Sequence, residues 1–199
     1  NVIEGEYFSA RELQRSTGNL HRLGFFEDLE VQTKKGSRED LMVLDINVKE
    51  KRTGAFSVGL GYSTFDNVMG TFQISESNFR GYGQTLSASA RLGSRTTEFD
   101  IRFTEPWLFD RPISAGFGIY SWTREFDEYT RESLGGLVRF GFRLPFEEQN
   151  VNRLWATYAY DDTDVTDVEP FASAIIRDQA GKTVTSSVIV RLNRDTRDK

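Results

Sequence analysis

From residue 53 onward the sequence alternates between apolar residues and small or polar ones, and this pattern restricts the fold more than any other feature. In residues 53–63 (TGAFSVGLGYS), Phe56, Val58, Leu60 and Tyr62 are separated by alanine, serine and glycine. Successive side chains of a β-strand point to opposite faces of its sheet. The stretch therefore predicts a strand with one apolar face and one face of small or polar residues.

Seven further segments repeat this alternation and are separated by turns of unequal length. They lie at residues 67–79, 84–92, 97–104, 113–126, 133–144, 153–161 and 183–193. Alternating strands of about ten residues are typical of a transmembrane β-barrel, which faces lipid on one side and water on the other. We therefore expect a mainly β fold of about eight antiparallel transmembrane strands. A mean hydropathy of −0.49 fits this expectation, because only every second residue of such a strand is apolar.

Two of these segments carry charged or large aromatic residues on the face opposite their apolar residues. Glu98, Asp100 and Arg102 share one face of their segment, so we expect them to face a wet lumen, where Asp100 and Arg102 pair with neighbours. Tyr120 and Trp122 lie on the face opposite the apolar residues of their segment. This interruption predicts a β-bulge, or an exit from the membrane, near Tyr120.

The first fifty residues follow a different pattern, that of a small soluble α/β unit. Ser9 and Glu12 form a capping-box signature, and Gly24 is a suitable helix stop. The Thr17-Gly18 pair is expected to weaken that helix or split it. Two strands follow, at residues 25–33 and 41–50, and are expected to pair as a hairpin. So few residues bury little core, and the chain starts at Asn1, so we expect a fragment of a longer protein.

The composition argues against several functional classes. No run of about 18 apolar residues exists, which excludes a transmembrane helix. The chain has no cysteine, which argues against a disulfide scaffold and against a thiolate metal site. The net charge is −5 without a basic stripe, which argues against a nucleic-acid partner.

Candidate chemical sites have weak support in the sequence. His21 is the only histidine, so it has no second histidine or cysteine with which to share a metal or a catalytic role. The acidic residues between 161 and 169 lack the spacing of an EF-hand, which favours a solvated loop. Glu98, Asp100 and Glu105 resemble paired carboxylates of a hydrolase, but on an alternating strand they are expected to be lumen charges. We therefore predict no enzyme, no cofactor and no metal site.

Several motifs follow one another in a specific order: LHRLGFFEDLEV, LDINVKEKRTGAFSVGLGYS, SESNFRGYGQ and FTEPWLF. Their order and spacing resemble the outer-membrane protein assembly factor BamA family. The resemblance implies that residues 1–50 are a partial periplasmic POTRA domain and that residues 51–199 are the N-terminal half of an outer-membrane β-barrel of sixteen strands. The closing strand of that barrel, its lumen-inserted loop motif and the leading strand and helix of the POTRA domain have no counterpart in the sequence.

The resemblance implies a core component of the machinery that folds and inserts β-barrel proteins. Its first barrel strand is expected to template incoming client strands along an exposed edge. The residues assigned to this edge are Thr53, Gly54, Ala55, Phe56, Ser57, Val58, Gly59, Leu60, Gly61 and Tyr62. The glycines would keep the strand pliable, or they would only fit a curved barrel wall. Expected partners are unfolded outer-membrane proteins, assembly-complex lipoproteins and the lipid bilayer.

Two other functions stay open at this point. One is a polypeptide secretion channel of the two-partner type, with a polar conducting lumen. The other is an outer-membrane enzyme in which eight strands close on themselves, although His21 lies outside those strands and no other base is available. For localisation we expect the bacterial outer membrane, with the N-terminal part in the periplasm, because short turns face the periplasm and the long acidic loop at 162–182 faces outward.

Overall fold

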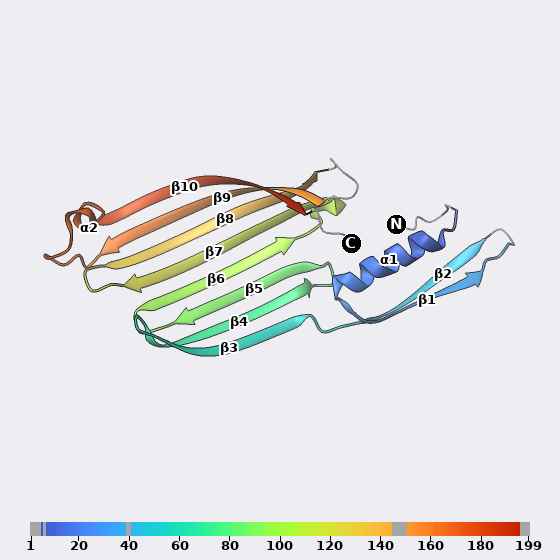
Figure 1. Ribbon diagram of the computed structural model, residues 1–199, viewed down its shortest axis with the longest axis horizontal. Coiled ribbons are helices and arrows are strands. Elements are labelled where there is room, and N and C mark those ends of the chain that lie inside the picture. Colours follow the sequence, from blue (N-terminus) through green and yellow to red (C-terminus); the bar gives the residue numbers. More distant parts are fainter. Residues whose placement is uncertain (1–4, 6, 39–40, 145–150, 196–199) are drawn as a thin grey trace. The chain divides into compact units, whose positions relative to one another are not determined.

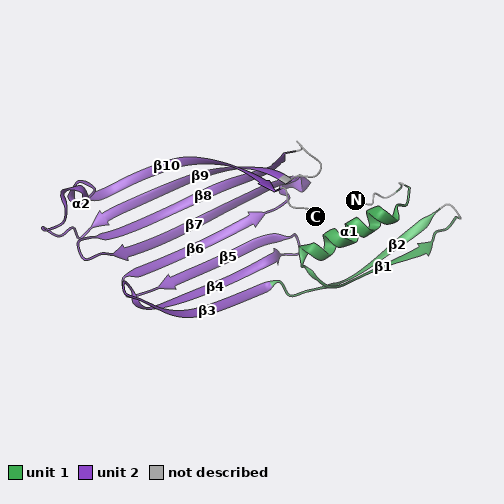
Figure 2. Ribbon diagram, in the orientation of Figure 1, with its two compact units in different colours: residues 1–53 green, residues 54–199 purple. Residues whose placement is uncertain are grey.

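The computed structural model describes residue 5 and residues 7–38, 41–144 and 151–195. The chain divides into two compact units, Asn1–Thr53 and Gly54–Lys199 (Figure 2). Each unit has its own secondary structure.

The first unit begins with the expected helix, α1 (Ala10–Leu23). The Ser9 hydroxyl accepts a hydrogen bond from the Glu12 amide at 3.4 Å, and Gly24 ends the helix with φ of 70°, a left-handed conformation that glycine adopts without strain. Of the two effects expected of the Thr17-Gly18 pair, a split of the helix does not occur. The Thr17 hydroxyl donates to the Leu13 carbonyl at 2.9 Å, which satisfies its polar atom inside a continuous helix.

A two-stranded antiparallel sheet of β1 (Phe26–Lys35) and β2 (Met42–Glu50) follows, which confirms the predicted hairpin. Two exposed ion pairs join the strands, Lys34 with Asp45 at 2.5 Å and Lys49 with Glu27 at 2.8 Å. One helix and one hairpin do not make a POTRA domain evident, so this assignment stays a prediction.

The second unit is one antiparallel sheet of eight strands in sequential order, from β3 at one edge to β10 at the other (Figure 1). A short 3₁₀ turn, η1 (Leu108–Asp110), and a short helix, α2 (Ala174–Asp178), lie in its connections. The strands are β3 (Gly54–Ser63), β4 (Asn67–Phe79), β5 (Gln84–Leu92), β6 (Thr96–Glu105), β7 (Ile113–Glu125), β8 (Thr130–Leu144), β9 (Val151–Thr166) and β10 (Gly181–Asp195).

The register brings the apolar residues of successive strands to one face. One row across the sheet runs through cross-strand partners from Phe56 to Ile74, Ala88, Ile101 and Ile119. Most of these side chains are exposed, and in the described residues the only buried apolar ones are Val165 and Ala172. A continuous exposed apolar face of this size needs an apolar partner, because soluble proteins rarely leave such a patch in water.

The opposite face is polar along the same strands. The neighbouring row runs through partners from Ser57 to Gln73, Ser89, Asp100 and Tyr120. The two-sided pattern predicted from the alternation is therefore present in the sheet.

Two local features differ from the prediction. Of the two alternatives near Tyr120, the bulge does not occur, because β7 pairs with both β6 and β8 without a shift of register. The acidic loop at 162–182 is shorter than expected, since β9 continues to Thr166 and β10 begins at Gly181. Pairing with β8 extends the sheet through residues that are polar except for the buried Val165.

The connections at one end of the sheet are tied together around Asp66. Its side chain is buried and accepts a hydrogen bond from the Arg95 amide at 3.3 Å, while its carbonyl accepts one from the Ser94 hydroxyl at 2.7 Å. The Phe65 and Phe126 rings lie 5.5 Å apart, which links a third connection to the first two. The β3–β4 hairpin is thus fastened to its neighbours at this end.

Candidate functional site

Strand β3 forms one edge of the eight-stranded sheet and contains nine of the ten predicted site residues; Thr53 immediately precedes it. It pairs with β4 over its whole length, from Gly54 opposite Glu76 to Ser63 opposite Asn67. In the described part of the chain no strand pairs with its other side. Alternate N–H and C=O groups of an antiparallel strand point to each side, so β3 presents a row of unused donors and acceptors.

The side chains of β3 are also less covered than those inside the sheet. Phe56 and Leu60 are 81% and 84% exposed, whereas Ile101, on an interior strand, is 44% exposed. The difference arises because an edge strand has a neighbour on one side only. The edge therefore offers both a hydrogen-bonding ladder and apolar side chains to an added strand.

Gly59 has a packing reason to be glycine. A Cβ at this position would lie 2.6 Å from the Thr71 hydroxyl, which approaches closely enough to donate a hydrogen bond to the Gly59 carbonyl at 3.5 Å. At Gly61 a Cβ would lie 3.3 Å from the Met69 side chain, a contact that a flexible residue can relax. The geometry thus favours close cross-strand packing at Gly59 over flexibility alone.

The other edge of the sheet is β10, which pairs with β9 only. The two edges do not pair with each other among the described strands, so the sheet is open. Closure of eight strands into a small barrel, one of the three possibilities raised by the sequence, is absent from the described strands.

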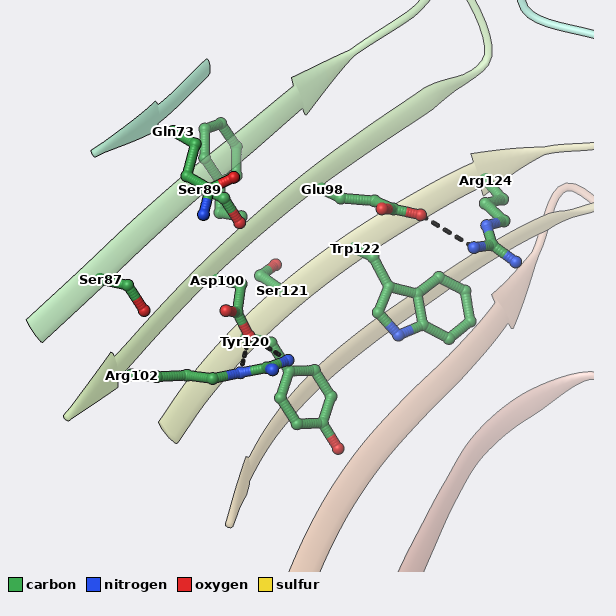
Figure 3. Close-up of a pocket in the computed structure, with 11 residues that line it drawn as sticks. Gln73, Ser87, Ser89, Glu98, Asp100, Arg102, Tyr120, Ser121, Trp122 and Arg124 are labelled. Carbon is green, nitrogen blue, oxygen red and sulfur yellow. Dashed lines mark hydrogen bonds and ion pairs between the residues drawn. The ribbon is translucent and has the colours of Figure 1, made fainter. Parts of the chain in front are cut away.

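The polar face of β4 to β7 is hollowed, with a volume of about 550 Å³ (Figure 3). Glu98 lies between two arginines there and pairs with Arg91 at 3.0 Å and with Arg124 at 2.8 Å. Asp100 pairs with Arg102 on its own strand at 3.0 Å. Asp100 and Arg102, which were expected to pair with neighbours, therefore pair with each other, and Glu98 pairs with arginines of the two adjacent strands.

Large aromatic side chains on the polar face lie over glycines of the next strand, an arrangement that the sequence did not reveal. A Cβ on Gly135 would lie 2.5 Å from the Tyr120 ring, and one on Gly141 would lie 2.5 Å from the Trp155 ring. Tyr120 thereby reaches across β8 and donates a hydrogen bond to Asp161 on β9. Glycine is required here by close approach, and this is why Tyr120 needs no bulge.

The remaining candidate residues are not brought into a chemical site. His21 lies in the first unit near the end of α1. Within the described residues, no three His, Cys, Asp or Glu side chains are grouped so that they could hold a metal ion. None of the described helices combines the length and the apolar character needed to cross a membrane.

A family model for the Omp85 superfamily domain matches residues 78–199, which is more than half of the chain. The chain belongs to the Omp85 superfamily. Among Omp85 relatives, it is 31% identical over 197 residues to the outer membrane protein assembly factor BamA of Nitratidesulfovibrio vulgaris, covering 99% of this chain and 24% of the relative. It is 24% identical over 192 residues to BamA of Neorickettsia risticii, covering 94% of this chain and 25% of that protein.

Solved Omp85 structures have the same fold. BamA from Haemophilus ducreyi lacking POTRA domains 1–3 superposes with a TM-score of 0.69 at 22% identity, covering 96% of this chain and 38% of that one. CdiB from Escherichia coli superposes with a TM-score of 0.62 at 15% identity, covering 96% and 37%. The family resemblance predicted from the motifs is confirmed. The chain spans about a quarter of the length of its curated BamA relatives.

Proposed function

We propose that this chain is the part of a bacterial outer-membrane assembly machine that receives client strands, and that strand β3 is the receiving edge. One observation carries the proposal: β3 is fully paired with β4 on one side and has no partner strand on the other within the described sheet. The similarity to BamA proteins supports the choice of outer-membrane proteins as clients.

The proposed mechanism is addition of a strand, and no covalent bond is made or broken in the client. The client's N–H and C=O groups pair with those of β3, in the manner of β-augmentation. Each such hydrogen bond contributes only about 0.5–1.5 kcal/mol net. A ladder of weak bonds can therefore form and dissolve stepwise, which suits a template and requires no enzyme active site.

The apolar face of the sheet fits lipid, and the polar face fits a wet lumen. We place the sheet in the outer membrane, with the first unit in the periplasm, where accessory lipoproteins would reach it. The connections at residues 64–66, 93–95 and 126–129 at one end of the sheet are as short as the connection at residues 80–83 at the other end. Only the connection at 167–180, at the former end, is long, and we assign that end to the exterior.

A polypeptide secretion channel is the second candidate. The charged hollow on the polar face and the similar fold of CdiB favour it. A channel would conduct ions through its lumen and would lose secretion when the lumen is plugged. A template would instead lose activity when the β3 edge is blocked.

Proline substitution at adjacent positions of β3 tests the template. Of the Val58 and Gly59 N–H groups, one points toward β4 and the other points away from the sheet, because neighbouring residues of a strand alternate in direction. Proline at either position removes the N–H of that residue. The variant that keeps the β3–β4 ladder, identified by hydrogen exchange, is expected to stay folded and to stop inserting a client barrel into liposomes. Normal insertion by that variant would contradict the proposal.

A further inference from the structure

The polar face of β8 to β10 carries four arginines near one end of the strands: Arg139, Arg143, Arg153 and Arg191. Arg143 and Arg153 are direct cross-strand partners. Arg191 lies opposite Trp155, and the Arg139 guanidinium lies 4.7 Å from the centre of the Trp155 ring. All four arginines are exposed, so the group forms one accessible basic patch around an aromatic ring.

The charges of this arginine patch are not balanced as those of the neighbouring hollow are. Arg91, Arg102 and Arg124 each pair with Glu98 or Asp100. In the described part of the chain, no ion pair joins any of the four patch arginines to a carboxylate. Like charges placed directly opposite in a sheet, about 5 Å apart, are destabilising. The Arg143–Arg153 pair is therefore a local source of charge repulsion within the sheet. Unfavourable local arrangements of this kind concentrate at functional sites.

Among the described residues, the nearest acidic ones by register on this face lie beyond the patch. Asp195 lies opposite Val151, beyond Arg153, and Asp161 accepts the hydrogen bond of Tyr120 further along β9. The patch therefore fits an anionic partner that arrives from outside the sheet.

We propose that the arginine patch binds a carboxylate-rich segment of an extended polypeptide. Arginine forks bind carboxylates in bidentate geometry, and they do so more strongly than neutral donors. The patch lies on the polar face of the sheet, and the apolar row that fits lipid lies on the other face. A peptide on the polar side can therefore reach the patch, whereas the headgroup of a lipid packed against the apolar face cannot. This inference is independent of strand pairing at β3, since β3 and the patch lie at opposite edges of the sheet (Figure 1).

The test measures peptide binding by isothermal titration, with the protein reconstituted in uncharged detergent micelles. The probes are an eight-residue glutamate-rich peptide and the same peptide with glutamine in place of glutamate. We expect the glutamate peptide to bind at least about tenfold more tightly at low salt, and to weaken as salt rises. Equal affinity for both peptides would overturn the proposal.

Matched variants separate this patch from general charge. R143Q/R153Q is expected to weaken binding at least about fivefold, and removal of like-charge repulsion protects its fold. R143K/R153K, which keeps the charge but loses the fork, should fall between that variant and the wild type. R124Q removes one charge from the same face at a paired arginine and should change binding less than about twofold.

Three further outcomes would overturn the proposal. The first is an equal loss on R124Q. The second is binding that appears only in E147Q/E148Q, which neutralises two glutamates that follow Arg143 by four and five positions in the sequence. The third is patch-dependent binding of anionic phospholipid bicelles without binding of the glutamate peptide.

Discussion

The Tyr120 hydroxyl donates a hydrogen bond to the Asp161 carboxylate across the whole width of strand β8, passing over Gly135. The contact joins β7 to β9, two strands that do not pair with each other. The contact therefore stiffens the sheet in the direction across its strands. Backbone hydrogen bonds join only neighbouring strands, whereas this side-chain bond joins two strands that are separated by β8.

Removing this hydrogen bond or the space beneath it should loosen the sheet. Y120F is expected to lower the free energy of unfolding by about 1.5–3 kcal/mol, the range for a bond to a charged group. G135A places a Cβ about where the Tyr120 ring lies, so it should also destabilise. The two costs should not add in the double variant, because the Cβ of G135A displaces the Tyr120 ring and so already breaks the hydrogen bond that Y120F removes. Denaturant unfolding in micelles measures all three, and additive costs would show that the residues do not interact.

Asp66 should stabilise the end of the β3–β4 hairpin. D66A removes a buried carboxylate that accepts a hydrogen bond from the Arg95 amide. It is expected to lower the free energy of unfolding by about 1–3 kcal/mol. Faster amide exchange is expected at residues 63–67 and 93–96, because the two connections lose their tie. D127A serves as the control, since it removes an exposed ion pair with Arg95 and should cost less than about 1 kcal/mol. An equal effect of the two variants would contradict this role.

Gly59 offers a direct test of why the edge strand is rich in glycine. If close packing decides, G59A should impair pairing with β4, and T71A should restore it by removing the hydroxyl 2.6 Å from the new Cβ. If pliability decides, the double variant should remain as inactive as G59A alone. Client insertion and hydrogen exchange of β3 and β4 distinguish the two, and we expect rescue.

Most of the strands could be predicted because their apolar residues recur at every second position of the sequence. The alternation of Phe56, Val58, Leu60 and Tyr62 requires only that one face be apolar, and this is a property of the local sequence. The sequence predicted that β9 ends at Asp161, because acidic residues such as Asp162 and Asp164 are typical of a loop. Pairing with β8 nevertheless continues past both residues.

The site was harder to predict because its features depend on which residues face each other across strands. Tyr120 suggested a bulge, since nothing local shows that Gly135 lies opposite and leaves room for the ring. In the same way, Arg143 and Arg153 are ten positions apart in the sequence and become neighbours only through the register of β8 and β9.

Site-specific disulfide trapping tests the central claim most directly, because the chain has no cysteine of its own. The protein as the cell makes it would carry S57C on the β3 edge, or S89C in the same cross-strand row on β5, where both sides are paired. Single cysteines would be placed along the last strand of a folding client. We predict crosslinks from S57C to alternate client positions in one register during assembly, and none from S89C. No crosslink from S57C while the client still assembles, or equal crosslinking from both positions, would contradict templating by β3.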